Sequence, residues 1–153
     1  MTIADRIELV RVFPVSRERV WAALTQPEQL SQWFEPMPYV DLRVGGGIRL
    51  GRDHPTGVIE VVEPPHRFAF RWHASKETGG DLSLPVTQTA STLVEFTLEE
   101  IAEGTRLILV QSGFASLPGD AVESYLKLNQ RGWNGALTNL ERTLQGEMPP
   151  ARG

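Results

Sequence analysis

The sequence predicts an α+β fold in which a curved antiparallel sheet of six to seven strands packs against one long C-terminal helix. Apolar residues recur at helical spacing through residues 117–146, and a period of two marks strands between residues 39 and 111. Short turns between successive strands favour antiparallel pairing. The apolar face of such a sheet needs a cover, which the long helix provides. Because a strongly curved sheet around one helix need not fill its interior, we expect an internal cavity.

The chain opens with a strand and two short helices. Residues 6–13 are rich in Ile, Leu and Val, and Pro14 ends the strand. Ser16 is placed to cap a helix that runs to about Leu24. Thr25 and Glu28 have the spacing of a capping box, which predicts Thr25 as the N-cap of a second helix over residues 27–34.

The middle of the chain predicts the sheet. Strands are expected at residues 39–44, 48–51, 58–62, 66–73, 92–100 and 105–111. The segment 66–73 is the clearest, because Phe68, Phe70 and Trp72 alternate with residues of the other face. Gly45-Gly46-Gly47 predicts a turn or bulge. Residues 52–57 are expected to form a hairpin loop, and residues 74–91 a long polar loop of the kind that is usually functional or disordered.

Residues 117–146 are expected to form the long helix. Asp120 and Glu123 match a capping box at its start, and Gly146 followed by two prolines ends it. The apolar positions are Val122, Tyr125, Leu126, Trp133, Ala136, Leu137, Leu140 and Leu144. Asn129, Gly132 and Gly135 interrupt this stripe, which favours the wall of a cavity. The alternative is close packing of the helix on the sheet at the glycines, with Asn129 facing solvent.

Composition limits the class of protein. The 153 residues predict one domain, 1–153, with residues 148–153 as a disordered tail. A hydrophobic content of 41%, a charged content of 22% and a net charge of −4 give no footprint for nucleic acid or an anionic membrane. The absence of cysteine excludes disulfides, thiol catalysis and thiolate metal sites. Without a secretory signal or an apolar run of membrane-spanning length, a cytoplasmic location is expected.

Few residues suggest catalysis. His54, His66 and His73 are the histidines, and the first two are expected in solvated turns. His73 follows the aromatic strand, either as an exposed strand-end residue or as a general base. No metal-ligand spacing, nucleophile elbow, phosphate loop or dinucleotide fingerprint occurs, so we expect no catalytic motif, metal or cofactor. Arg49 either points inward, where it would orient a ligand's anionic or carbonyl group, or is solvated on the outer face.

Several stretches carry a resemblance to a known family. They are residues 12–24 (VFPVSRERVWAAL), 27–34 (PEQLSQWF), 45–46 (GG), 61–68 (VVEPPHRF), and Gly132-Trp133 with Leu137, Leu140 and Leu144. In these stretches the chain resembles the helix-grip superfamily of START-like lipid-transfer domains, birch-pollen-allergen-like proteins and polyketide cyclases. More narrowly, it is similar to bacterial homologues of the activator of the heat-shock-protein-ninety ATPase. The resemblance covers nearly the whole chain and is specific for fold more than for activity.

The resemblance implies a ligand cavity between sheet and long helix. Its wall would contain Trp33, Phe34, Phe70, Trp72, Phe96, Ile108, Val110, Tyr125, Asn129 and Trp133. The family has no universal catalytic motif to carry over. Eukaryotic activators have a separate N-terminal domain that engages the chaperone, whereas this sequence starts at the first strand, so a chaperone-activating role is doubtful.

We therefore expect a module that binds a small hydrophobic or amphipathic ligand, lipid-like or polyketide-like, between sheet and helix. Residues 74–91 and 35–38 would control entry. One alternative is a cyclase, dehydratase or hydrolase that uses Asn129, Tyr125, Gln111 or His73 in proton transfer. Another is an interaction protein, either a homodimer or a chaperone partner.

Overall fold

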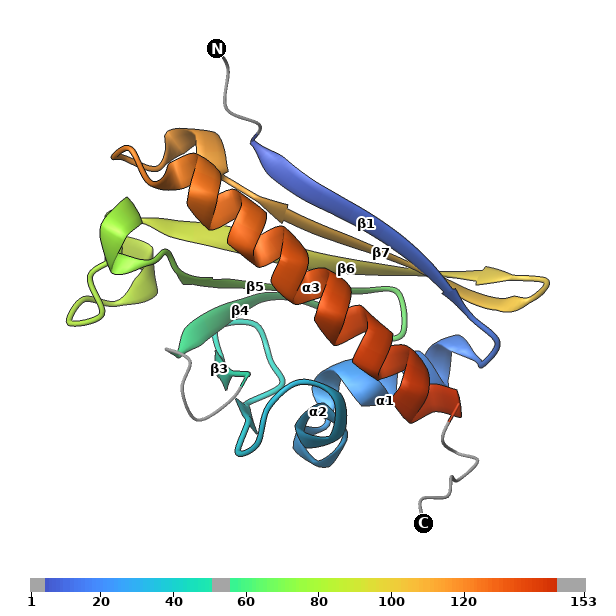
Figure 1. Cartoon of the computed structure of the whole chain (residues 1–153). Helices are drawn as coiled ribbons and strands as arrows, with labels where there is room; N and C mark the ends of the chain where they lie inside the picture. The colour runs from blue at the N-terminus through green and yellow to red at the C-terminus, as the bar shows by residue number, and fades with distance from the viewer. Residues whose placement is uncertain (1–4, 51–55, 146–153) are drawn as a thin grey trace.

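Seven antiparallel strands form one sheet in the computed structural model, which describes residues 5–50 and 56–145 (Figure 1). The strands are β1 (Arg6–Phe13), β2 (Tyr39–Val40), β3 (Gly47–Arg49), β4 (Gly57–Glu63), β5 (Arg67–His73), β6 (Ser91–Ile101) and β7 (Gly104–Ser112). Their order is β1-β7-β6-β5-β4-β3-β2. The predicted fold class is confirmed. Most of the predicted loop 52–57, with the predicted tail 148–153, lies outside the described residues.

The predicted strand over residues 39–44 is reduced to two residues. After Asp41 the chain turns, with hydrogen bonds from Arg43 N to Asp41 O and from Gly46 N to Arg43 O. A Cβ atom on Gly46 would collide with the carbonyl oxygen of Asp41, so glycine is required in this turn. Gly45 N then donates to Ile59 O, which ties the turn to β4.

Alternation along the strands builds the core. Phe68, Phe70 and Trp72 in β5 face the same side as Val94, Phe96 and Leu98 in β6, and all of them are buried. The register pairs Phe68 with Phe96, and Phe96 in turn with Leu109 of β7. The concave face is therefore a continuous apolar surface against which a helix can pack.

Two short helices follow β1. The first, α1 (Arg17–Thr25), has the expected Ser16 cap, whose hydroxyl oxygen accepts from Arg19 N at 3.2 Å. The second, α2 (Pro27–Trp33), begins after Gln26, so the prediction of Thr25 as its N-cap is wrong. Thr25 instead ends α1, where its hydroxyl donates to Trp21 O at 2.8 Å.

The long helix α3 (Val122–Gln145) crosses the sheet diagonally, with α1 and α2 beside its C-terminal half (Figure 1). It begins one residue later than an Asp120 cap requires, since Tyr125 N donates to Ala121 O. Its buried side chains include Trp133, Leu137 and Leu140, which join the core of the sheet. Within residues 5–50 and 56–145, no helix combines the length and apolarity that a membrane span requires.

Candidate functional site

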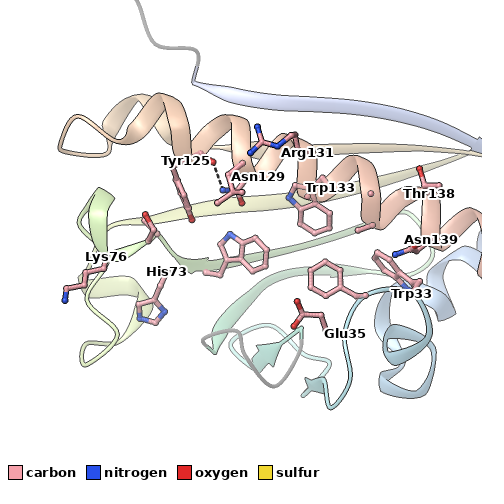
Figure 2. A pocket seen from close by; sticks show the side chains of 18 of the residues that line it. Trp33, Glu35, His73, Lys76, Tyr125, Asn129, Arg131, Trp133, Thr138 and Asn139 are labelled. Atoms are coloured by element: carbon pink, nitrogen blue, oxygen red, sulfur yellow. Dashed lines mark hydrogen bonds between the residues drawn. The ribbon is translucent and has the colours of Figure 1, made fainter.

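A cleft of about 900 Å³ runs along one flank of α3. Figure 2 shows Tyr125, Asn129 and Trp133 projecting from the helix, with Glu35 on the opposite side of the cleft. The connection after β5, which contains the short 3₁₀ helix η1 (Lys76–Thr78), lines one end. Two lining residues, Leu82 and Leu128, are 67% and 57% exposed, so the cleft opens to the surface. The space thus lies beside the helix, whereas the core directly beneath it is packed with side chains.

The cleft has an aromatic floor, which we define as Trp33, Phe34, Trp72 and Trp133. Trp72 and Trp133 stack with ring centroids 5.8 Å apart and an interplanar angle of 23°. Phe34 lies 5.7 Å from Trp133 and also 5.7 Å from Trp33, measured between ring centroids. These rings come from α2 and its C-cap residue, from β5 and from α3, so three parts of the chain must assemble before the floor exists.

A chain of buried hydrogen bonds orients the two stacked indoles. Trp133 Nε1 donates to Gln111 Oε1 at 2.8 Å, and Gln111 Nε2 donates to Thr92 Oγ1 at 2.9 Å. Trp72 Nε1 also donates to Thr92 Oγ1, at 3.1 Å. Gln111 and Thr92 are fully buried, so their polar atoms need these partners. Both indole N–H groups therefore point into the protein.

The second short helix is fixed by another tryptophan. Ala23 O would normally accept from the backbone N–H of residue 27, but Pro27 has none. Trp33 Nε1 fills this position by donating to Ala23 O at 2.8 Å. The bond positions Trp33, and Phe34 after it, in the wall of the cleft.

Polar and charged groups surround the aromatic floor. Charged residues lining the cleft are Glu35, Lys76, Arg131 and Arg142, and Arg142 Nη1 lies 3.4 Å from Asn139 Oδ1. Asn129 Nδ2 donates to the backbone oxygen of Tyr125 at 2.8 Å. Burial raises the pKa of the Tyr125 phenol, while hydrogen bonds with the Asn129 side chain and the Ser75 backbone act in the opposite direction. The cleft thus combines an apolar base with a polar margin.

The histidines are placed differently from one another. His73 lines the cleft but is only 9% exposed, with Nε2 2.9 Å from Leu84 O and Nδ1 buried without a hydrogen-bond partner. It is therefore not the exposed strand-end residue considered from the sequence. His66 is exposed, as expected, but its Nδ1 lies 2.9 Å from Arg17 Nη1. His54 lies outside the described residues.

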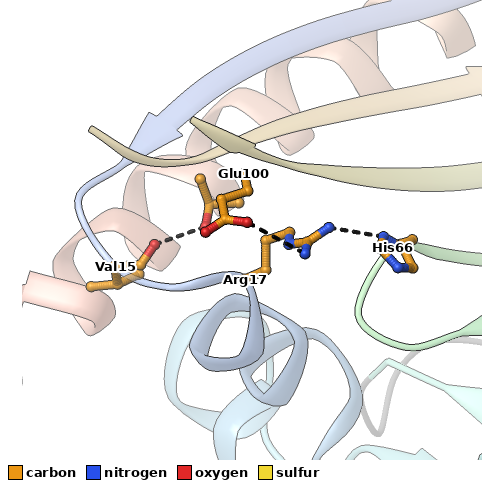
Figure 3. Close-up of polar contacts among 5 residues, drawn as sticks. Val15, Arg17, His66 and Glu100 are labelled. Atoms are coloured by element: carbon orange, nitrogen blue, oxygen red, sulfur yellow. Dashed lines mark hydrogen bonds and ion pairs between the residues drawn. The ribbon is translucent and has the colours of Figure 1, made fainter. Parts of the chain in front are cut away.

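Figure 3 shows that the Arg17–His66 contact belongs to a polar cluster at the start of α1. Neither residue lines the cleft. Arg17 Nη2 lies 3.6 Å from Glu100 Oε1, and Thr105 Oγ1 donates to Val15 O at 2.7 Å. These contacts tie the start of α1 to β6 and β7. In the part of the chain that the structure describes, no group of three or more histidine or acidic side chains is arranged to hold a metal ion.

The structure brings most of the predicted wall together. Trp33, Phe34, Trp72, Tyr125, Asn129 and Trp133 all line the cleft. Phe70 and Phe96 lie behind it in the core, with ring centroids 5.5 Å from Trp72 and 5.8 Å from Trp133, respectively. They support the floor and do not line the cleft.

Ile108 and Val110 do not belong to the wall, which corrects their placement by resemblance. In β7, Leu107, Leu109 and Gln111 are the fully buried set, so alternation directs Ile108 and Val110 to the outer face. The sequence has apolar side chains on both faces of this strand and so does not mark which face is inward. Leu82, Leu128 and Ser75, which no pattern in the sequence indicated, line the cleft instead.

The sequence also left open which way Arg49 points and why the long helix contains two glycines. Ile48 is in the core, so alternation directs Arg49 to the opposite face, where Nη2 lies 3.5 Å from Met37 O. Gly132 and Gly135 line the cleft, and a Cβ atom on either would meet nothing within 4 Å. Close packing of the helix on the sheet therefore does not explain these glycines.

Comparisons with known proteins agree with this fold. MLL2253 from Mesorhizobium loti has a similar structure (TM-score 0.73, 22% identity), covering 95% of this chain and 99% of that protein. CalU16 from Micromonospora echinospora gives a TM-score of 0.72 at 28% identity, over 94% of this chain and 78% of that protein. DynU16, from the dynemicin biosynthetic locus, gives 0.73 at 24% identity, over 94% of this chain and 48% of that one.

No curated protein matches the chain significantly. Residues 14–145, by contrast, match the family described as Activator of Hsp90 ATPase homolog 1-like protein. The match runs from the turn after β1 to the last described residue of α3 and so includes all of the aromatic floor. The chain therefore belongs to the family of Activator of Hsp90 ATPase homolog 1-like proteins.

Proposed function

We propose that this protein binds a small hydrophobic or amphipathic ligand, lipid-like or polyketide-like, in the cleft beside α3. The observation that carries the proposal is the aromatic floor, in which both stacked indoles direct their N–H groups away from the cleft. A volume of about 900 Å³ is within the usual range for small-molecule sites, which are mostly apolar with a few polar groups.

The margin of the cleft supports an amphipathic ligand. Lys76 and Arg142 line it, together with the amides of Asn129 and Asn139. A ligand whose apolar part covers the floor would place its polar group near these side chains. Residues 35–38 and 74–91 are proposed to control entry, since Glu35 and Leu82 line the cleft.

The contacts favour binding over proton-transfer catalysis. Both ends of the Gln111 amide are bonded to other buried side chains, and Gln111 does not line the cleft. Asn129 Nδ2 bonds to the backbone, and His73 Nε2 lies against Leu84 O. The raised pKa of Tyr125 disfavours its ionisation near neutral pH. A general acid or base needs a group free to reach the substrate at a suitable pKa.

Thermal denaturation with added decanoic acid, naphthalene or 1-anilinonaphthalene-8-sulfonate tests the proposal. A ligand at 100 times its Kd should stabilise the protein by about 2.7 kcal/mol, or about 5–10 °C in Tm for a chain of this size. Native mass spectrometry of freshly purified protein should also detect a co-purifying small molecule. If none of the three compounds raises Tm and no small molecule co-purifies, the proposal is wrong.

Tryptophan variants provide a matched comparison. Trp133→Phe removes part of the floor and should weaken binding by about tenfold, because the smaller ring reduces the contact area with the ligand and the stacking on Trp72. Trp21→Phe removes an indole that packs on Phe68 and does not line the cleft, so binding should persist. Equal affinities for the two variants would contradict a site on the aromatic floor.

A further inference from the structure

We infer that Gln111 and Thr92, although they do not line the cleft, determine which ligands its floor accepts. They hold the indole N–H groups of Trp133 and Trp72, and Ala23 O holds that of Trp33, so the floor presents no free indole donor. The floor then selects hydrocarbon or aryl surface and rejects ligands that place a carbonyl or other acceptor there. This inference rests on the proposed function, since it concerns the specificity of the same cleft.

The direction of each hydrogen bond follows from the chemistry of the groups. An indole N–H can only donate, so Trp133 requires the oxygen of the Gln111 amide. The NH₂ group of Gln111 must then face Thr92 Oγ1, which also accepts from Trp72. The two residues stand on neighbouring strands, β7 and β6, so the sheet fixes the spacing of the acceptors. The amide therefore has one orientation that satisfies both ends.

The position of this series of hydrogen bonds makes it a determinant of ligand specificity. Trp72 and Trp133 line the cleft directly above it, and both are at most 8% exposed. A ligand acceptor buried against these rings would lose its water without gaining a donor, which is unfavourable. An isosteric change that removes the protein acceptor would leave an indole N–H without its buried partner, so that the ring is free to turn this donor toward the ligand. The variant would then favour ligands that carry an acceptor.

A matched pair of probes tests this inference. 2-Ethylnaphthalene and 2-acetylnaphthalene share a skeleton and differ by one carbonyl, and equilibrium dialysis measures the Kd of each. The wild-type protein should bind the ethyl compound at least about tenfold more tightly. In Gln111→Met and in Thr92→Val this preference should fall by about fivefold, the worth of one neutral hydrogen bond.

Leu140→Ala is the control for general destabilisation, because Leu140 is fully buried in α3 and does not line the cleft. Its preference between the probes should equal that of the wild type. Hydrogen exchange of the indole Nε1–H groups, followed by NMR without ligand, should accelerate more in Gln111→Met and Thr92→Val than the loss of stability in each variant explains, whereas in Leu140→Ala it should follow the loss of stability.

The outcomes separate the two proposals. If the wild type binds 2-ethylnaphthalene but the preference is unchanged in both variants, the role of Gln111 and Thr92 is wrong and ligand binding stands. If Leu140→Ala changes the preference as much as Gln111→Met does, the effect is a general loss of packing and the inference is overturned. If the wild type binds neither naphthalene derivative, the floor does not accept aryl surface and this inference is overturned, whereas the proposed function is decided by the Tm and co-purification measurements.

Discussion

The indole N–H of Trp33 donates to the carbonyl oxygen of Ala23, and this bond replaces the one that Pro27 cannot make. It joins α2 to α1, because the donor lies at the end of one helix and the acceptor within the other. Trp33 is 2% exposed, so neither group can exchange its partner for bulk water. The helix break that Pro27 imposes is thus stabilised by the side chain of Trp33, ten residues after Ala23.

Trp33→Phe should destabilise the protein by about 1–3 kcal/mol, the cost of leaving a buried carbonyl without a partner. Urea denaturation measures the change in the free energy of unfolding. Ser31→Ala is the control in the same helix: Ser31 is exposed, so its change should stay within about 0.5 kcal/mol. Similar effects for both substitutions would show that the Trp33–Ala23 bond contributes nothing.

Gly132→Ala and Gly135→Ala should each stabilise the protein while weakening ligand binding. Alanine is favoured over glycine within a helix by about 0.5–1 kcal/mol, and neither added methyl group meets an obstacle. Both methyl groups would nevertheless enter the cleft. Overpacking costs of about 1 kcal/mol correspond to roughly fivefold weaker binding. Urea denaturation and equilibrium dialysis of 2-ethylnaphthalene measure the two effects.

Gly46→Ala is the contrasting substitution, since its methyl group would collide with the carbonyl oxygen of Asp41. It should lower the free energy of unfolding. If the helix substitutions also destabilise the protein, the space beside α3 is not open as described. If they stabilise it and leave the affinity for 2-ethylnaphthalene unchanged, the ligand does not occupy that part of the cleft.

Ile108→Thr and Val110→Thr should leave ligand affinity within about twofold of the wild type. Their side chains lie on the outer face of β7, with the sheet between them and the cleft. The cost in stability should be small, on the order of 1 kcal/mol. Leu109→Ala, on the inner face, should cost about 2–5 kcal/mol. A loss of binding in Ile108→Thr with stability retained would instead support the wall that the resemblance implied.

Strand β7 shows why the fold was predictable from the sequence and part of the site was not. In β5 and β6, Phe70 is followed by Arg71 and Phe96 lies between Glu95 and Thr97, so alternation assigns both rings to the inner face correctly. In β7 the residues Leu107, Ile108, Leu109 and Val110 are all apolar, so hydrophobicity cannot tell the faces apart. The polar residue that follows, Gln111, is nevertheless buried. Its amide accepts from Trp133 and donates to Thr92, which in turn accepts from Trp72, and both tryptophans are far away in sequence.

The long helix also shows that local sequence predicts an element but not the position of the cleft beside it. Its apolar stripe predicted the buried residues, and Asn129 and Gly132 indicated a wall that is not solid core. The side of the helix on which the space opens depends on where α2 and the connection after β5 lie. The Thr25–Glu28 pattern fitted a capping box but did not show that α1 continues through Thr25. Local spacing thus predicted elements, while long-range contacts determined the cleft.

The Tyr125 phenol should make stability depend on alkaline pH. Its pKa is raised in the folded protein chiefly by burial, partly against Phe114, whose ring centroid lies 5.8 Å away. Between the unfolded pKa, near 10, and the higher folded pKa, the unfolded chain binds fewer protons than the folded protein. The free energy of unfolding must therefore fall as pH rises through this window. The neutral phenol contributes its full stabilisation only below the unfolded pKa.

Tyr125→Phe should remove this part of the pH dependence. Urea denaturation between pH 9 and pH 12 should show a shallower decline for the variant, by at most about 1.4 kcal/mol per pH unit. Tyr39→Phe is the control, since Tyr39 is 52% exposed, and its curve should parallel the wild type. Parallel curves for Tyr125→Phe and the wild type would mean that the phenol ionises as easily in the folded protein as in the unfolded chain.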